Sequence, residues 1–317
     1  MVPVDRDIIT TERDLATVTG FEVFGVNSSG TYRGEIQALE QYLDTHDPNV
    51  LLQITRPPTH GTIAGVLARR HDVPFVYRYS GDRFYEYRVA RGSDRLKAFG
   101  LGATLGRLPI RLATRHITLG PTGKRRLIAR GVSPDRITIL PPTVDPTRFD
   151  DPDPVSLDVP RDRTVVLFVG RLSHLKGVDT LERIIPEVLN QRDDLQFVCV
   201  GDAERELDLP QHARDHVSII GRVPPDAVPN YMATADLLVH PSLTEGVPRV
   251  LLEALAVGTP VLARDVGDVA SVTDNTFRTD TQLVVKLMHL EALPLDDVAP
   301  FTREHLAPAY QRFFEHW

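Results

Sequence analysis

Two cations follow an apolar run in the second half of the chain, at a spacing that suits a phosphate group. Gly170 closes the run, and Arg171 and Lys176 lie five residues apart ahead of a segment with helical periodicity. Arginine offers a planar fork of N–H donors and lysine a point charge, so the two can hold a diphosphate from two sides. A charged surface turn has the same pattern, and the residues alone leave both interpretations open.

Two carboxylates follow a second apolar run. Glu245 lies in the loop after this run, and Glu253 comes four residues after Arg249, on the same face of a helix expected to open at residues 247–248. Pro248 suits the first turn of a helix, where its missing N–H would have no partner. Free N–H groups at a helix start suit an anion, whereas carboxylates suit hydroxyl groups such as those of a sugar. The residues therefore predict a site for a ligand that carries both phosphate and hydroxyl groups.

Short apolar strands separated by helical segments must position these residues. The expected strands are residues 21–26, 49–54, 73–79, 116–120 and 136–140 in the first half, and 164–170, 195–201, 216–221, 235–241 and 259–264 in the second. Strands that are apolar on both faces and alternate with helices predict parallel sheets covered by helices. Ligands bind such sheets at the carboxyl ends of the strands, which is where both candidate pairs lie.

The chain divides into two expected α/β domains and a closing helix. Its 317 residues exceed the roughly 250–300 at which a single core stops growing. Residues 149–163 are rich in Pro and Asp and predict a linker between a first domain, 1–148, and a second domain, 164–300. Residues 301–317 predict an amphipathic helix whose aromatic side chains need a surface to pack on.

Composition excludes several classes of protein. With 42% hydrophobic and 25% charged residues the chain is globular, and the single cysteine, Cys199, excludes a disulfide framework. No apolar run reaches the roughly 18 residues of a membrane span, and the N-terminus lacks a signal-peptide core. We therefore expect a soluble, cytoplasmic protein.

A basic stretch lies within an otherwise acidic chain. Residues 83–130 hold 12 Lys and Arg against 2 Asp and Glu, although the net charge of the whole chain is −7. This stretch is either a solvated helix face or the contact for an anionic partner. Because residues 83–115 also carry apolar side chains, they predict contact with an anionic membrane face or a lipid-phosphate-linked partner. Nucleic acid is not expected, because the stretch lacks regularly interleaved aromatic side chains.

Two segments of the second half resemble a known family. FVGRLSHLKG followed by HPSLTEGVPRVLLEALAVGTPV is similar to the retaining glycosyltransferases of family 4, and Glu245 and Glu253 match the E-x7-E motif of that family. The resemblance is clear over residues 116–270 and holds in outline over 50–115. It implies the GT-B fold, with two Rossmann-like parallel-sheet domains that face a cleft and a C-terminal helix that crosses back to the first domain. It also implies a nucleotide-sugar donor as substrate, with no metal and no other cofactor.

The resemblance implies a role for each candidate residue. Arg171 and Lys176 would bind the donor diphosphate, Glu253 would bind the ribose hydroxyls, and Glu245 would be the catalytic residue beside the transferred sugar. Arg222 and Val223 would lie near the base, and Gly246, Val247 and Pro248 near the phosphate and sugar. Gly170, which closes the apolar run, and Arg249, on the helix face of Glu253, are the remaining donor-binding candidates.

The chain also departs from the family pattern. The first strand and the Gly-rich loop that usually open the family are not recognisable in residues 1–26, and Pro141-Pro142-Thr143-Val144-Asp145 stands for the usual Pro-Asn-Gly-Val-Asp. Where many members carry a histidine, this chain has Tyr79-Ser80-Gly81-Asp82, and Asp82 is the candidate base on the acceptor side, with a structural turn as the alternative.

These observations predict a retaining glycosyltransferase that moves a hexose-type sugar from a nucleoside-diphosphate sugar to a glycan or lipid-linked acceptor. Two alternatives remain. The first is a GT-B subunit that has lost catalysis and binds a partner transferase, which the unrecognised Gly-rich loop favours and the intact cations and glutamates oppose. The second is a nucleotide-sugar epimerase, which would need an acid and base pair around the sugar.

Overall fold

The computed structural model describes residues 7–10, 22–25, 32–81, 84–157, 159–160, 162–315 and 317. Asp82 and most of residues 1–26 lie outside this set, so the predictions made for them stay predictions. The chain forms two compact units: Met1–Arg78 with Thr104–His116 and Trp317, and Tyr79–Ala103 with Ile117–His316. Every side-chain contact described below lies within one of these units. The domain boundaries expected from the sequence also stay predictions.

The first unit begins with a short parallel ladder between β1 (Asp7–Thr10) and β2 (Glu22–Gly25). Its helices are α1 (Tyr32–Thr45), α2 (Pro57–Arg70) and α5 (Arg107–Leu112). Strand β3 (Leu51–Gln53) pairs in parallel with β4 (Phe75–Tyr79), and β5 (Arg115–Thr118) follows β4 in the strand order. Strand β6 (Ile137–Ile139) belongs to the second unit. Phe75, Val76 and Tyr77 are fully buried, as expected for strands covered on both faces.

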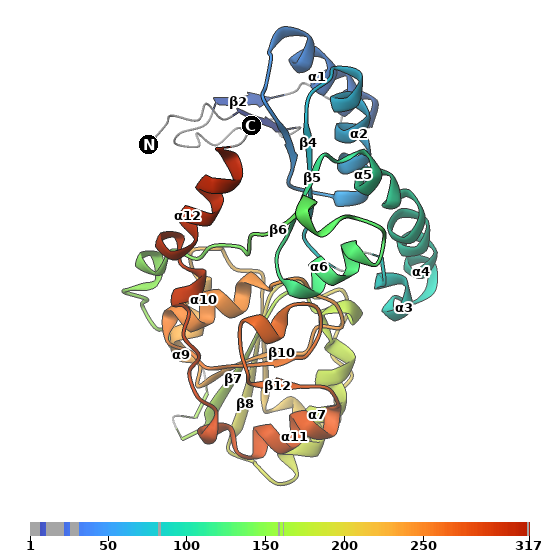
Figure 1. The fold of residues 1–317 in the computed structure, drawn as a ribbon. Helices are drawn as coiled ribbons and strands as arrows, with labels where there is room; N and C mark the ends of the chain where they lie inside the picture. The colour runs from blue at the N-terminus through green and yellow to red at the C-terminus, as the bar shows by residue number, and fades with distance from the viewer. Residues whose placement is uncertain are drawn as a thin grey trace. The chain divides into compact units, whose positions relative to one another are not determined.

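The second unit is built on a six-stranded parallel sheet (Figure 1). Its strands are β7 (Thr164–Val169), β8 (Leu195–Val200), β9 (Val217–Gly221), β10 (Leu237–His240), β11 (Val261–Arg264) and β12 (Thr276–Phe277). Alternate residues of β7 enter two separate cores. Val166 and Phe168 pack on one face of the sheet, and Val165 and Leu167 pack on the other. Both faces are therefore covered, which explains why these strands read as continuous apolar runs.

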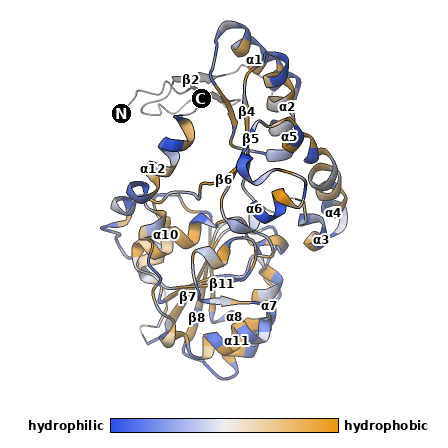
Figure 2. Cartoon of the chain, in the orientation of Figure 1, coloured by the Kyte–Doolittle hydropathy of each residue, from blue (hydrophilic) through white to orange (hydrophobic). Residues whose placement is uncertain are grey.

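Helices cover the two faces. Side chains of α7 (Val178–Leu189), α8 (Gln211–Arg214) and α11 (Asp280–Met288) enter the first core, and side chains of α9 (Val228–Thr234) and α10 (Arg249–Val257) enter the second. Figure 2 shows hydrophobic and hydrophilic residues alternating along α11, the pattern of a helix with one buried face. The remaining helices of this unit are α3 (Glu86–Val89), α4 (Gly92–Ala98), α6 (Pro121–Ile128) and α12 (Arg303–Phe314).

Short helices fill several connections. They are the π-helix Phe99–Leu105 and the 3₁₀ turns Pro134–Arg136, Pro146–Phe149, His174–Lys176, Val269–Ser271, Leu290–Ala292 and Ala299–Phe301. Among the described residues, no helix combines the length and the apolarity that crossing a bilayer requires.

The strand order of the six-stranded sheet locates a crevice. The order β12-β11-β10-β7-β8-β9 means that the chain starts at β7, runs outward through β8 and β9, and then returns to the other side of β7 at β10. The direction of the connections reverses between β7 and β10, which pair through Leu237 and Val166. The loops that leave such a pair diverge at the carboxyl ends of the strands and leave room for a ligand between them. The two candidate loops from the sequence, 170–177 and 241–248, are the loops that leave β7 and β10.

Each expected strand that lies within the described residues is present, and the GT-B class of two parallel-sheet α/β domains is confirmed. One expectation was displaced: α10 begins at Arg249 with Pro248 as its N-cap, so Pro248 precedes the helix and Glu253 lies just over one turn inside it. The helices of the basic stretch, α3 to α5, were not predicted. Strand β12 was also missed, because a two-residue strand has too short a pattern to detect.

Candidate functional site at the carboxyl ends of β7 and β10

The loop after β7 turns sharply at Gly177 and thereby presents Lys176. Residues His174–Lys176 form a 3₁₀ turn, and Gly177 has φ 84°, in the left-handed region, where it also serves as the N-cap of α7. A Cβ atom at Gly177 would collide with the carbonyl oxygen of Pro241 in the loop after β10. Glycine is therefore required here both by its backbone angle and by the close approach of the two loops.

Gly177→Ala is expected to destabilise the protein more than Gly258→Ala. Gly258 has φ 93° at the end of α10, and no atom lies within 4 Å of a Cβ added there, so alanine there meets the cost of the left-handed backbone alone. This cost is about 1 kcal/mol, and alanine at Gly177 adds the collision with Pro241. Chemical denaturation of both variants measures the difference. Equal losses of unfolding free energy would show that the close approach has no energetic weight.

An ion pair joins the two candidate loops. The Lys176 Nζ atom lies 2.6 Å from Glu245 Oε1, and the same oxygen lies 3.0 Å from Nε2 of His240, the last residue of β10. The Glu245 side chain is 13% exposed, the Lys176 side chain 38% and the His240 side chain 2%. The structure thus brings together two residues predicted from separate parts of the sequence, and it adds a buried histidine as a third member.

The Glu245 carboxyl group stays ionised in this setting. Burial alone would raise its pKa, but the hydrogen bond from His240 and the positive charges of His240 and Lys176 outweigh burial and lower the pKa to about 2. A carboxylate with one face occupied by cations and fixed in place offers permanent negative charge to whatever lies beside the loop. Its geometry therefore suits electrostatic stabilisation of positive charge.

Glu253 has the opposite electrostatic character. Its carboxylate lies 3.5 Å from Arg249 Nη2, as the four-residue spacing predicted. Burial raises its pKa above the usual value, and the charges of Arg249 and Arg148 offset only part of that rise. The fold therefore holds an incompletely compensated carboxylate on α10, and a ligand hydroxyl group that donates a hydrogen bond would stabilise it.

The other donor-side candidates occupy the same edge of the sheet. Arg171 is exposed, and its Nη1 atom lies 3.4 Å from Glu204 Oε1. Arg222, which follows β9, is also exposed, and the partly buried Val223 packs against the second core. Gly170 has φ 149° at the end of β7. Val247 is buried. Arg171 pairs with Glu204 and Lys176 pairs with Glu245, so the diphosphate clamp stays a prediction.

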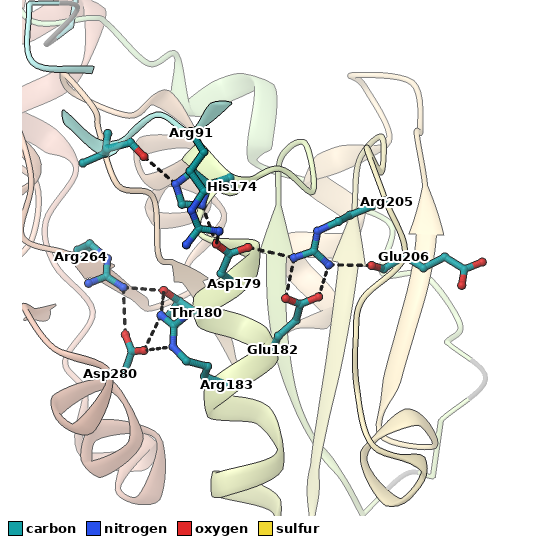
Figure 3. A network of polar contacts seen from close by, with 11 residues as sticks. Arg91, His174, Asp179, Thr180, Glu182, Arg183, Arg205, Glu206, Arg264 and Asp280 are labelled. Atoms are coloured by element: carbon teal, nitrogen blue, oxygen red, sulfur yellow. Dashed lines mark hydrogen bonds and ion pairs between the residues drawn. The ribbon is translucent and has the colours of Figure 1, made fainter. Parts of the chain in front are cut away.

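A network of charged side chains fixes the loop that carries Lys176 (Figure 3). Within it, His174 Nδ1 lies 2.6 Å from Asp179 Oδ2 and His174 Nε2 lies 2.7 Å from the carbonyl oxygen of Val89. Arg91 reaches the same carboxylate oxygen at 2.6 Å. The network therefore ties residues 89–91 of the basic stretch to the start of α7.

Arg205 connects this group to Glu182. Its guanidinium group contacts Asp179 Oδ1 at 3.0 Å and forms two hydrogen bonds with the Glu182 carboxylate. Burial would raise the pKa values of Asp179 and Glu182, but hydrogen bonds and charges from Arg205 and, for Asp179, from His174 lower both. Both groups contribute stability above their unfolded pKa values of 3.8 and 4.5, and this contribution disappears as the pH falls through the lower folded values.

In the variant Asp179→Asn/Glu182→Gln, the free energy of unfolding is expected to fall less than in the parent as the pH is lowered from neutral to acidic. At neutral pH it should lose roughly 1.5–3 kcal/mol for each charge-assisted hydrogen-bonding group, and the difference from the parent should vanish at low pH. Thermal melting from neutral to acidic pH measures this. The matched control, Asp193→Asn/Glu187→Gln, changes exposed carboxylates and should follow the parent. A double variant that parallels the parent at every pH would contradict this role for the network.

A second anchor holds α6 beside the loop after β10. The buried carboxylate of Asp268 accepts hydrogen bonds from the backbone N–H of Thr122 at 2.6 Å and of Gly123 at 3.4 Å, at the start of α6. Asp268 N in turn donates to the carbonyl oxygen of Gly246 at 3.0 Å. The Glu245–Gly246 loop is therefore fixed to α6 through one aspartate.

Sequence reasoning missed His240, Asp268, His174 and Asp179. A histidine that ends an apolar strand five residues before a candidate glutamate was a usable signal for His240. Asp268 carried none, because its partners lie 146 and 145 residues away in the chain. Cys199 is buried in β8, and burial raises its pKa to about 12. Among the described residues no cluster of His, Cys, Asp or Glu could hold a metal ion.

The site therefore combines a lysine and an arginine after β7, a fixed carboxylate after β10 and an incompletely compensated carboxylate on α10. Two family models match the chain: "Glycosyl transferases group 1" over residues 163–293 and "Glycosyl transferase 4-like domain" over residues 5–143. The chain belongs to the group 1 glycosyltransferases of family 4.

Curated relatives agree with this assignment. The chain is 32% identical over 170 residues to the phosphatidylinositol N-acetylglucosaminyltransferase GPI3 subunit of Saccharomyces cerevisiae, which covers 51% of this chain and 38% of the relative. It is 30% identical over 240 residues to TuaC of Bacillus subtilis, a glycosyltransferase named for teichuronic acid biosynthesis, covering 74% of this chain and 56% of the relative. It is 34% identical over 174 residues to D-inositol 3-phosphate glycosyltransferase of Acidothermus cellulolyticus, covering 49% and 39%. The chain thus spans between about two fifths and three fifths of the length of these relatives.

Solved structures support the fold. Sucrose-phosphate synthase of Thermosynechococcus elongatus superposes with a TM-score of 0.75 at 19% identity, over 98% of this chain and 88% of the other. HepE of Anabaena, solved in complex with UDP, superposes with a TM-score of 0.65 at 18% identity, over 94% and 86%. At these identities the likeness establishes the shared fold.

Proposed function

We propose that the chain is a retaining glycosyltransferase that moves a hexose-type sugar from a nucleoside-diphosphate sugar to a glycan or lipid-linked acceptor. The observation that carries this proposal is the contact of Lys176 with Glu245 at the strand-order reversal, because it sets a phosphate-binding cation beside a fixed carboxylate. Family membership and the UDP complex of HepE support a nucleotide-sugar donor. No metal or other cofactor is included in the proposal.

The reaction breaks the bond between the anomeric carbon and the diphosphate oxygen and forms a bond from that carbon to an acceptor oxygen. Arg171 and Lys176 stabilise the negative charge that develops on the leaving diphosphate. Glu245 stabilises the positive charge that develops on the sugar ring, and Glu253 accepts hydrogen bonds from the ribose. Asp82 is the proposed acceptor-side base.

The basic segment 83–115 is proposed to meet the acceptor. The name of the GPI3 relative contains phosphatidylinositol, and the name of the Acidothermus relative contains inositol 3-phosphate. TuaC is named for teichuronic acid. An anionic acceptor would explain why positive charge is concentrated in this part of an acidic chain. Contact with an anionic membrane face through the same segment belongs to this proposal.

A second candidate is a non-catalytic subunit. The name of the GPI3 relative describes a subunit, so a partner protein is a specific alternative. The ionised state of Glu245 and its contact with Lys176 favour catalysis, since a binding subunit needs neither. Release of free nucleoside diphosphate from a donor sugar by the purified chain separates the two candidates.

The test of the proposed function compares nucleotides by isothermal titration calorimetry. UDP, GDP and ADP are each titrated alongside the corresponding monophosphate. At least one diphosphate should bind more tightly than its monophosphate, by about tenfold or more, because only the second phosphate engages both Arg171 and Lys176. The difference should shrink as salt rises. Absence of binding by every diphosphate would refute the proposal.

A further inference from the structure

One oxygen of the Glu245 carboxylate receives two hydrogen bonds. Lys176 Nζ donates to Oε1 at 2.6 Å, and His240 Nε2 lies 3.0 Å from the same atom. Among the described residues no donor binds Oε2. The two contacts therefore hold the carboxylate by one oxygen and leave the other oxygen to the sugar that the proposed function places beside it.

The two donors differ in how firmly the fold holds them. His240 is the last residue of β10, lies opposite Ala263 of β11 in the ladder, and has a side chain that is 2% exposed. Lys176 lies in the 3₁₀ turn after β7, and its side chain is 38% exposed. A lysine has a flexible four-carbon stem, whereas close-packed neighbours hold a buried imidazole ring. His240 is therefore the fixed donor, and Lys176 is the adaptable one.

The backbone of the Glu245 loop has anchors of its own. Leu243 N donates to the carbonyl oxygen of Leu175 at 2.9 Å, and Asp268 N donates to that of Gly246 at 3.0 Å. These bonds hold the chain on both sides of Glu245 without using any side-chain atom of position 240. Loss of the imidazole would therefore release the Glu245 side chain and leave the loop in place.

Binding of the donor would change the balance between the two contacts. Under the proposed function Lys176 binds the diphosphate, so its charge and its N–H groups are shared with phosphate oxygens. The attraction of Lys176 for Glu245 then weakens, and a carboxylate held by Lys176 alone would lose its orientation. The His240 contact persists, because the backbone of His240 is part of the sheet.

We propose that His240 is a positioning residue that holds the Glu245 carboxylate beside the sugar while Lys176 binds the diphosphate. This role rests on the proposed function. His240 acts through Glu245 and does not touch the substrate itself. By keeping Oε1 occupied it keeps the carboxylate in one orientation as positive charge develops on the sugar ring, and small displacements of such a group are costly to the rate.

Two amide variants separate positioning from simple loss of the imidazole. In His240→Gln the amide can reach the place of Nε2 and donate to Glu245, whereas in His240→Asn the shorter amide reaches only the place of Nδ1. His216→Asn is the control for loss of an imidazole elsewhere in the same sheet. His216 precedes β9 at the amino end of that strand, where it contacts the carbonyl oxygen of Leu195.

Release of nucleoside diphosphate from a donor sugar gives the turnover number, and calorimetry gives the affinity for free diphosphate. His240→Asn should lower the turnover number at least about tenfold and keep the diphosphate affinity within about twofold of the parent. His240→Gln should keep turnover within about threefold of the parent, because the donated hydrogen bond is restored. His216→Asn should match the parent. A purely structural role would lower the melting temperature and the diphosphate affinity together with turnover.

Two results would overturn the proposal: equal turnover in His240→Asn and the parent, or equal losses in both His240 variants. A parent that releases no diphosphate would refute the proposed function instead. Crystal structures of the parent and His240→Asn, grown with nucleoside diphosphate, test the positioning without turnover. The Glu245 carboxylate should leave its parent orientation in His240→Asn, and an unchanged orientation would overturn the role even if the parent proves inactive.

Discussion

Glu245→Gln is expected to lower the turnover number by about 10²–10³-fold and to leave the binding of free nucleoside diphosphate intact. Glutamine keeps the shape of the side chain but removes the negative charge that would stabilise the sugar as its bond to phosphate breaks. Free diphosphate has no sugar and does not use this charge. Lys176, which lies 2.6 Å from Glu245, remains to bind the diphosphate and no longer shares its charge with a carboxylate. Turnover is measured as release of nucleoside diphosphate, and binding by calorimetry.

The same substitution should also lower stability. Because the folded pKa of Glu245 is about 2 against 4.5 in the unfolded chain, the carboxylate contributes roughly 3 kcal/mol above pH 4.5, and this contribution is lost as the pH falls toward 2. Glu187→Gln, on the exposed face of α7, is the matched control and should change neither stability nor turnover. If Glu245→Gln retains the turnover of the control, Glu245 is not the catalytic carboxylate.

Glu253→Ala is expected to weaken donor binding by roughly 10–150-fold without lowering the melting temperature of the free protein. The loss of affinity follows from the loss of charge-assisted hydrogen bonds to the ribose. The melting temperature is preserved because burial raises the pKa of Glu253, so above pH 4.5 its charged form opposes folding. Alanine removes that charge and is the best helix former, at the cost of a weak pair with the exposed Arg249.

A substitution that stabilises the free protein and weakens its ligand indicates that the residue is retained for binding. Differential scanning calorimetry with and without nucleoside diphosphate gives both quantities from one sample. Glu187→Ala is the control, because it replaces an exposed helix glutamate that lies outside the candidate site. A fall in melting temperature for Glu253→Ala, with unchanged affinity, would show that Glu253 is a structural residue.

The fold was largely predictable because its strands are buried on both faces. A run such as residues 164–169 is apolar throughout, since alternate side chains enter two cores, and such runs mark the strands without ambiguity. The short helices α3 to α5 were not predictable in the same way, because their residues are mainly polar or exposed and their helical pattern is weak.

The residues of the candidate site were predictable where a charged side chain lies in a recognisable turn after an apolar strand. Lys176 and Glu245 were both singled out from the turns in which they lie, and the structure joins them. The contact itself could not be predicted, because 69 residues separate the two and strand order alone brings β10 beside β7. The arginines of residues 83–130 were visible in the sequence only as an excess of positive charge. Which of them lie beside the Tyr85 ring depends on the packing of α6 against residues 84–89.

The most direct test of a donor site between the loops of β7 and β10 measures one nucleoside diphosphate and its sugar on three proteins: the parent, Glu245→Gln and Glu253→Ala. Calorimetry gives the affinity for the diphosphate, and release of diphosphate from the sugar gives the turnover number. We expect Glu245→Gln to bind like the parent and turn over poorly, and Glu253→Ala to bind weakly. If both variants bind and turn over like the parent, the donor sugar does not bind at this site.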